Sequence, residues 1–150
     1  SLSTDIIVGF PGENESDFCD TLDVMEKVCF NFAFTFKYSS RPGTKAAEYS
    51  EQINEKVKQE RLERLIKLQK QITLKVNEKY IGKEINVLIE KESKRSPLQW
   101  AGRSEGNTWV IFDKKDEKIS DVVNVKIDDA QGVTLFGRKM IKEGNVYEAA

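Results

Sequence analysis

The hydrophobic pattern of this chain changes from a helical period to a strand period at Gly82, and the change divides the sequence into two parts that need different folds. Between residues 51 and 79 apolar side chains recur near helical spacing among Glu, Lys, Arg and Gln, whose charged face is expected to be solvated. Beyond Gly82 apolar and polar residues alternate, which is typical of a half-buried strand. We therefore predict a first domain over residues 1–78 that ends in a long amphipathic helix at about 51–79, a β-domain over 79–142, and a tail over 143–150.

Five short strands are predicted after Gly82, with no helical pattern between them. The first contains Ile85, Val87 and Ile89, and the others are expected at 98–104, 107–112, 122–127 and 133–138. Closure into a barrel removes the exposed edges that an open sheet of this size would present. The pattern therefore predicts a small five-stranded antiparallel β-barrel of the OB-like type.

The N-terminal part of the chain carries the pattern of a strand–helix–strand unit. Residues 5–10 lie in a continuous apolar run, as expected for a strand covered on both faces of a parallel sheet, and residues 32–38 form a second, aromatic strand. Asn14 is placed to cap the helix between them, with Asp17 near its positive end. The apolar face of this helix is predicted to contain Phe18, Leu22, Met25 and Cys29.

Composition narrows the chemistry that the chain can perform by itself. It has no histidine, which is the commonest general base and nitrogen ligand for metals. Cys19 and Cys29 are too far apart on one helix to form a disulfide bond, and both are expected to be packed thiols. No apolar run approaches the roughly 18–20 residues of a membrane span, so a cytoplasmic location is expected. With a net charge of −1, nucleic-acid binding would depend on a local basic patch.

Several stretches of the sequence are similar to a known enzyme family. Residues 4–13 (TDIIVGFPGE) and 38–44 (YSSRPGT) resemble the late barrel strands of radical-SAM methylthiotransferases. Residues 99–103 (QWAGR), 107–112 (NTWVIF) and 134–137 (TLFG) resemble the TRAM domain that ends the same family. The resemblance implies an α/β first domain, made of the last βα units of a partial TIM-type barrel, followed by an RNA-binding barrel. Because the chain starts within a strand and without an initiator Met, it is interpreted as a piece of a longer protein.

The resemblance implies a transferase as the parent protein. The RPGT sequence at residues 41–44 favours the branch of the family that adds a methylthio group to N6-isopentenyladenosine beside the tRNA anticodon. Action on another tRNA adenosine or on a ribosomal protein remains an alternative. The family uses S-adenosylmethionine and two [4Fe–4S] clusters, one of them held by a Cys-x3-Cys-x2-Cys loop. Neither cysteine triplet of the family is present, so we expect this chain to bind no metal, to lack catalytic residues and to be inactive alone.

The resemblance also implies that strand-end loops of the first domain form part of the S-adenosylmethionine site. The cofactor-site residues that it implies are Gly9, Gly12, Glu13, Tyr38 and Arg41. Several of them have a plainer interpretation: the glycines can simply make a tight turn, Tyr38 can pack in the core of an inward-facing strand, and Arg41 can form a surface ion pair. The neighbouring Phe36 is expected to pack in a core.

A basic cluster in the second domain suggests contact with tRNA. It consists of Lys91, Lys94 and Arg95, and Trp100 or Trp109 is a candidate for stacking on a base. Further candidates for RNA contact are Arg103, Arg138 and Lys139. A solvated loop is the alternative interpretation of the cluster.

The sequence also allows two other functions, a stand-alone RNA-binding module and a protein–protein adaptor that uses the long helix. The expected partners are tRNA, the missing N-terminal part of the same polypeptide, and a second copy associating through the truncated barrel.

Overall fold

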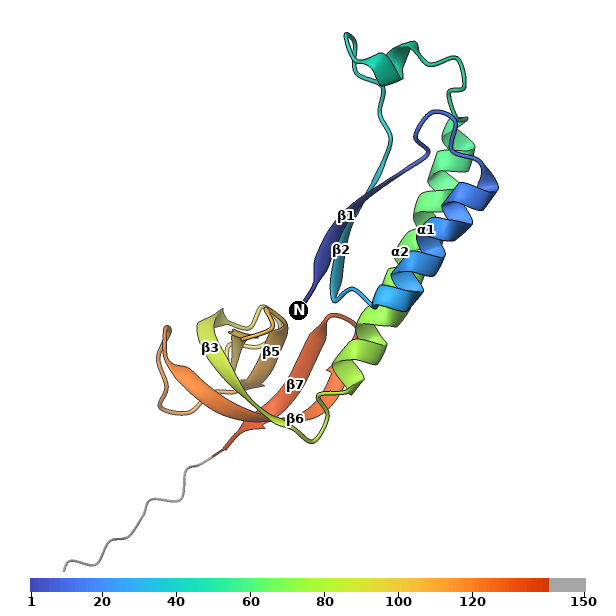
Figure 1. Cartoon of the computed structure of the whole chain (residues 1–150). Helices are drawn as coiled ribbons and strands as arrows, with labels where there is room; N and C mark the ends of the chain where they lie inside the picture. The colour runs from blue at the N-terminus through green and yellow to red at the C-terminus, as the bar shows by residue number, and fades with distance from the viewer. Residues whose placement is uncertain (141–150) are drawn as a thin grey trace, which may run out of the picture. The chain divides into compact units, whose positions relative to one another are not determined.

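The structure is a computed structural model that describes residues 1–140 (Figure 1). The chain forms two compact units, and the division falls between Val76 and Asn77, near the end of the long helix. The predicted tail, residues 143–150, lies outside the described residues. Over residues 1–140, each helix is too short or too polar to cross a lipid bilayer.

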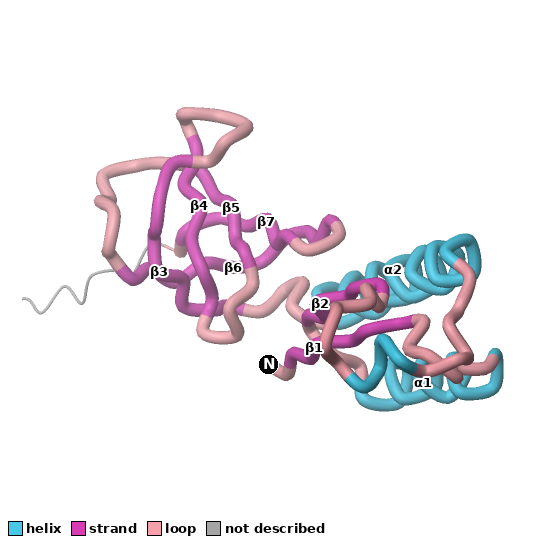
Figure 2. The backbone as a smooth tube through the Cα atoms, turned by 90° about the horizontal axis from the view of Figure 1, so that it is seen from above, coloured by secondary structure: helices cyan, strands magenta, loops and turns pink. Residues whose placement is uncertain are grey.

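The first unit is a two-stranded parallel sheet with two α-helices packed on one face (Figure 2). Strand β1 (Ser3–Val8) pairs with β2 (Phe32–Lys37) from Ser3 opposite Phe32 to Val8 opposite Lys37. Helix α1 (Glu15–Val28) connects the two strands, a 3-10 helix η1 (Lys45–Glu48) follows β2, and α2 (Glu55–Glu78) lies beside α1. The strand–helix–strand unit expected from the sequence is therefore present, with each strand ending slightly earlier than predicted.

The core of this unit joins the sheet to both helices. Val8, Phe18, Met25, Leu65 and Ile72 are buried together. The two α1 residues are seven positions apart, as are the two α2 residues, so each pair lies on one helix face two turns apart. Burial of each such side chain contributes about 1.5–3 kcal/mol.

Helix α1 begins and ends at residues with specific backbone roles. The Asn14 side chain accepts a hydrogen bond from the backbone N–H of Asp17, and the Asp17 carboxylate accepts one from the N–H of Asn14, so the predicted cap is a complete capping box. Cys29 terminates the helix in the left-handed conformation, with φ 56°. The prediction of packed thiols is wrong, since Cys19 and Cys29 are both exposed and free. The apolar stripe ends at Met25 because the chain leaves the helix before Cys29.

Helix α2 buries several polar side chains. It begins at Glu55, later than predicted, and residues 51–54 are not helical. Gln69 donates to the carbonyl of Phe30, and the Thr73 hydroxyl donates to the carbonyl of Asn31, so the helix satisfies the backbone of the turn before β2. The prediction that the charged face is solvated holds only in part, because some of its polar side chains are enclosed. Lys58 and Arg61 are also buried.

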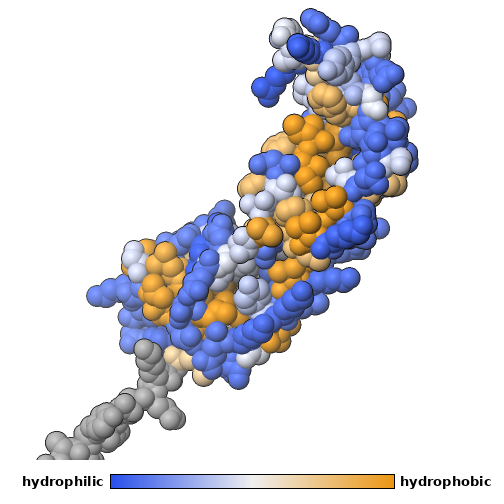
Figure 3. Space-filling model, in the orientation of Figure 1, coloured by the Kyte–Doolittle hydropathy of each residue, from blue (hydrophilic) through white to orange (hydrophobic). Residues whose placement is uncertain are grey.

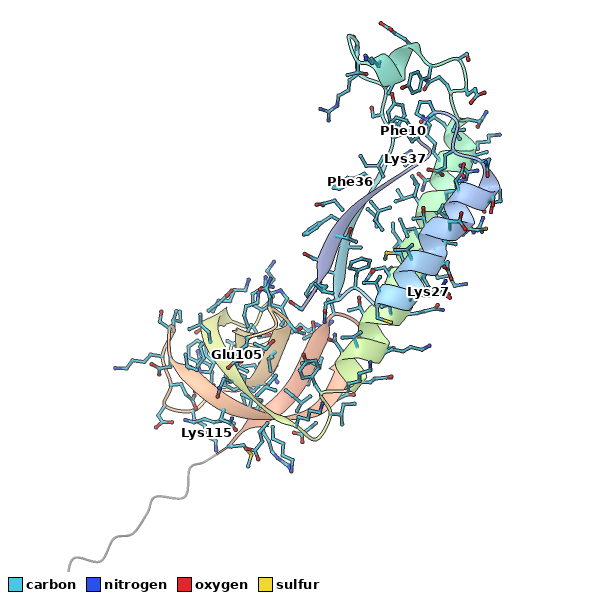
Figure 4. The ribbon with its side chains drawn as sticks, in the orientation of Figure 1. Phe10, Lys27, Phe36, Lys37, Glu105 and Lys115 are labelled. Atoms are coloured by element: carbon cyan, nitrogen blue, oxygen red, sulfur yellow. The ribbon has the colours of Figure 1, made fainter. Side chains whose placement is uncertain are left out.

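The sheet face turned away from the helices is apolar and exposed. Ile7, Phe34 and Phe36 are 57%, 61% and 52% exposed, and apolar side chains gather over β1 and β2 in Figure 3. In Figure 4 Phe36 projects from the sheet on the side opposite the helices. The expectation that Phe36 packs in a core is therefore wrong for this chain. Parallel sheets are almost always covered on both faces, so this surface is unusual.

The second unit is a closed five-stranded β-barrel with the strand order β3-β4-β5-β7-β6. Its strands are β3 (Glu84–Glu92), β4 (Gln99–Ser104), β5 (Trp109–Asp113), β6 (Val122–Gln131) and β7 (Thr134–Lys139). Alternate side chains of every strand, from Val87 to Leu135, fill the interior. The predicted barrel is present, but it is not wholly antiparallel. Strand β7 folds back from β6 and lies parallel to β5, which closes the barrel.

Two glycines allow the barrel strands to approach one another closely. Gly102 of β4 lies opposite Ile89, just before a bulge in β3, and Gly137 of β7 lies opposite Ile127, just before a bulge in β6. A Cβ at Gly102 would be 2.4 Å from the carbonyl oxygen of Leu88, and the corresponding distance for Gly137, to the Lys126 carbonyl, is 2.2 Å. Glycine opposite a bulge lets the strands bend sharply enough to close a small barrel.

Candidate functional site

The loop after β1 holds three of the residues assigned to a cofactor site, and α2 fixes its conformation. Glu13 Oε2 accepts a hydrogen bond of 2.8 Å from the N–H of Gly9. Its Oε1 lies 2.7 Å from Arg61 Nη1, which also donates to the Glu13 carbonyl. The side chains of Arg61 and Glu13 are only 6% and 13% exposed. The Glu13 carboxylate is thus engaged within the chain, where it holds the loop in place.

Lys58 of α2 contacts the ends of both strands. A Cβ at Gly9 would be 2.4 Å from Lys58 Cγ, and Gly9 has φ +75°, so the helix and the backbone conformation both require glycine here. Lys58 Nζ donates to the carbonyl of Tyr38 and lies 5.3 Å from the centre of its ring. Gly12 donates its N–H to the Glu51 carbonyl. The two glycines therefore shape the loop and pack it against neighbouring segments.

The two remaining candidates of this site lie together at a hollow of about 680 Å³. Ile7 and Phe36 form part of its apolar wall, and Tyr38 and Arg41 also line it. The Tyr38 hydroxyl is buried without a hydrogen-bond partner among residues 1–140, and the ring packs edge-on against Phe10 at 5.3 Å between centroids. Arg41 is exposed. The hollow thus combines apolar surface with a cation, and the Tyr38 that lines it has its hydroxyl buried within the chain.

In the second unit, Trp109 lies on the outer surface of the barrel beside two cations. The Arg103 guanidinium carbon is 3.9 Å from the centre of the indole, and Lys91 Nζ is 4.4 Å from it. Arg103 lies opposite Trp109 across β4 and β5 and is held by two 2.9 Å hydrogen bonds, to the backbone and the side-chain oxygens of Asn107. Its Nε lies 4.0 Å from a carboxylate oxygen of Glu90, the residue at the β3 bulge.

A hollow of about 350 Å³ adjoins the Trp109 ring. Ala101 and Ile111 are apolar lining residues, and Lys91 and Lys94 line it with their long cationic side chains. Arg95 follows in the same exposed loop. Lys94 and Arg95, two of the predicted RNA-contact residues, therefore lie in the segment beside Trp109.

Arg103 lies against Trp109 as well, whereas the remaining predicted RNA-contact residues occupy different places. Trp100 is 6% exposed and donates its indole N–H to Glu117, so its ring belongs to the barrel interior. Lys139 forms an ion pair with the buried Glu117, and Arg138 lies 3.7 Å from Asp128 at the second bulge. Neither Arg138 nor Lys139 lines the Trp109 hollow. Of the two tryptophans, Trp109 presents its face outside the barrel.

Metal-binding groups are sparse in the described chain. Over residues 1–140, no three His, Cys, Asp or Glu side chains are grouped closely enough to hold a metal ion. Cys19 Sγ contacts Glu15, and Cys29 Sγ contacts the Glu26 carbonyl, so the two thiols have separate surroundings.

Comparison with known proteins identifies the second unit and finds relatives of the whole chain. Residues 78–140 match the model of the TRAM domain. Over 91% of its length the chain is 46% identical to the tRNA-2-methylthio-N(6)-dimethylallyladenosine synthase of Acetivibrio thermocellus, and 47% and 49% identical to those of Syntrophomonas wolfei and Finegoldia magna. It spans 28%, 31% and 30% of these relatives, in their C-terminal part. The chain therefore carries a TRAM domain and is similar, over almost its whole length, to the C-terminal part of the tRNA-2-methylthio-N(6)-dimethylallyladenosine synthases.

Proposed function

We propose that this chain is the C-terminal part of a cytoplasmic enzyme that adds a methylthio group to N6-isopentenyladenosine beside the tRNA anticodon. The observation that carries the proposal is 46–49% identity, over almost the whole chain, to relatives named for that product. The names favour this substrate over another tRNA adenosine or a ribosomal protein. In this enzyme the first unit contributes to the catalytic domain, and the TRAM barrel contacts the tRNA.

The first domain, predicted from the sequence over residues 1–78 and ending at Val76 as a compact unit, is proposed to be the end of a radical-SAM barrel. Its parallel strands have helices on one face only, and the opposite face exposes Ile7, Phe34 and Phe36. In a barrel of βα units that face would be turned inward and covered by side chains of other strands. In the isolated chain the same apolar surface would favour self-association.

The cofactors of the proposed enzyme are S-adenosylmethionine and two [4Fe–4S] clusters. The described residues do not fit a cluster, since Cys19 and Cys29 are separate and no third ligand is near them. They do fit one wall of a nucleoside-binding site: Tyr38 and Arg41 line one hollow, and the buried Tyr38 hydroxyl lacks a partner among residues 1–140. S-adenosylmethionine would supply a radical there, while Tyr38 and Arg41 would bind and orient its polar groups.

The remaining residues assigned to this wall determine the conformation of the loop after β1. Gly9 and Gly12 allow the turn after β1, and Glu13 ties that turn to Arg61. We propose that they position the loop next to the cofactor.

For tRNA, the proposal rests on the exposed loop after β3. Lys94 and Arg95 are exposed and form no ion pair among residues 1–140, whereas Arg138 and Lys139 are paired with carboxylates. Cations without a protein partner are available to phosphate groups, and each phosphate contact adds to the salt dependence of binding. We retain Arg103 as a contact through its position beside Trp109, and Arg138 and Lys139 as peripheral contacts.

The test measures binding of the chain to an anticodon stem–loop by fluorescence anisotropy, repeated over a series of salt concentrations. Lys94→Gln and Arg95→Gln should each weaken binding and lower the salt slope by about one. Lys83→Gln, at the other end of β3, is the matched control and should change little. An anticodon stem–loop that binds no better than an unrelated polyanion would contradict the proposed tRNA contact.

A further inference from the structure

The two cations on Trp109 differ in how firmly they are held. Arg103 is fixed by two hydrogen bonds to Asn107 and lies near Glu90. Lys91 has no hydrogen-bond acceptor or carboxylate partner among residues 1–140, and only its 4.4 Å approach to the indole holds it. An exposed cation–π contact of this kind is worth about 0.5–1 kcal/mol, so Lys91 can be displaced at little cost.

The surface beside the ring suits a flat ligand with a negative charge at its edge. Ala101 and Ile111 line the hollow with short or apolar side chains, next to the Trp109 indole. Lys91 and Lys94 line it as well, and both are exposed. Planar apolar surface next to mobile cations is the combination that binds an unpaired nucleotide, whose base stacks while its phosphate contacts the cations.

We propose that the Trp109 hollow is a binding subsite for one unpaired nucleotide of RNA. The base stacks on the indole in place of Lys91, while Arg103 stays against the ring and keeps its orientation. Lys91 and Lys94 then contact the flanking phosphates. A base inside a duplex has no free face, so the subsite selects single-stranded or looped RNA. This inference rests on the proposed RNA-binding function and adds a location and a preference to it.

The experiment uses the full chain and a short unstructured oligoribonucleotide that carries one 2-aminopurine, with the matching duplex for comparison. Stacking on Trp109 should quench the 2-aminopurine fluorescence, and the single strand should bind more tightly than the duplex. Because base–aromatic stacking is worth about 1–3 kcal/mol, Trp109→Leu should weaken binding of the single strand about tenfold and abolish the quenching. Trp109→Phe, which keeps an aromatic face, should retain most of both.

Two controls separate this inference from the broader proposal. Val122→Ala removes an exposed apolar side chain away from the hollow and should leave affinity unchanged. The emission of Trp100 inside the barrel reports that each variant is folded. If Lys94→Gln weakens binding while Trp109→Leu does not, or if 2-aminopurine is not quenched, the subsite is wrong and RNA binding by the barrel stands. If no RNA binds, both are wrong.

Discussion

Arg61 is the residue on which the loop after β1 depends most. Its guanidinium is almost fully enclosed and contacts both the side chain and the backbone of Glu13, whose carboxylate in turn holds Gly9. Removal of one partner of a buried ion pair leaves the other charge uncompensated, which costs much more than the intact pair contributes.

We therefore expect Arg61→Met to lower the free energy of unfolding of the first unit by about 3 kcal/mol. Arg64→Met is the matched control, because Arg64 pairs with the exposed Glu15 and its side chain is 39% exposed, so its loss should be much smaller. Urea unfolding, monitored by circular dichroism at the helix band, measures the loss of unfolding free energy in both variants. The helix signal reports this unit because α1 and nearly all of α2 belong to it. Equal losses would show that burial of the pair does not matter.

The Glu117 carboxylate links barrel stability to pH. Its burial acts to raise the pKa, but hydrogen bonds from Lys139 and from the Lys115 backbone outweigh burial, so the pKa of Glu117 lies below its ordinary value of 4.5. A carboxylate with a lowered pKa stabilises the fold above its unfolded pKa, and this stabilisation is lost as the pH falls through the folded value.

Urea titrations monitored by tryptophan fluorescence should therefore show the barrel losing stability as the pH falls below about 4.5, and Glu117→Gln should flatten that loss. At pH 7 the variant should be the less stable protein. Glu92→Gln, which breaks the exposed pair with Lys114, serves as the control and should keep the wild-type slope. An unchanged slope in Glu117→Gln would assign the acid sensitivity to other carboxylates.

The sequence predicted local features of single residues well and tertiary ones poorly. Asn14 forms its cap because capping depends only on residues nearby in the chain. The burial of Lys58 and Arg61 was missed, because a lysine or arginine on a helix looks the same in the sequence whether its partner is water or a loop of distant residues. The choice between Trp100 and Trp109 needed the strand register, which decides the face of each ring.

Among the elements, β3–β4 and β6–β7 share one arrangement. In each pair a bulge at an acidic residue, Glu90 or Asp128, follows an inward isoleucine, and the facing glycine is followed by an arginine close to that acid. The glycines of the QWAGR and TLFG stretches are therefore explained by barrel closure. The arginine after each glycine has a different role, since it lies close to the acidic residue of the bulge.

Gly102→Ala and Gly137→Ala should each destabilise the barrel by roughly 1–3 kcal/mol, because the added methyl group would collide with a backbone carbonyl that cannot rotate away. Gly106→Ala provides the comparison, since its nearest neighbour would be a tyrosine hydroxyl at 3.6 Å. Thermal unfolding monitored by tryptophan fluorescence distinguishes them. A stable Gly102→Ala protein would mean that the strands can separate locally without cost.

At the same scale, the strands were predictable and their partners were not. Alternation of apolar residues located all five barrel strands, because period 2 is a local property of the chain. The parallel pairing of β5 with β7 was missed, since a strand that skips its neighbour in the sequence leaves no local mark. The bulges also depend on the partner strand.

For the molecule as a whole, we expect residues 77–140 to fold without the rest of the chain. Tyr80 packs against the barrel core, Asn77 donates to the Gly132 carbonyl, and Gly82 donates to Ile127. A segment that starts at residue 77 should therefore give dispersed amide spectra, and one that starts at residue 83 should be less stable because it loses these contacts. Equal stability of the two segments would place the boundary after Gly82.

The pairing of β7 with both β5 and β6 has a consequence for synthesis of the protein. While the chain emerges from a ribosome, β3, β4 and β5 appear first, and one edge of β5 stays open until Thr134–Lys139 has followed. An open edge next to incompletely covered apolar side chains is the kind of surface at which nascent chains aggregate. The barrel is protected only when its last strand arrives, so ribosome stalling within β6 would be more harmful than stalling anywhere after β7.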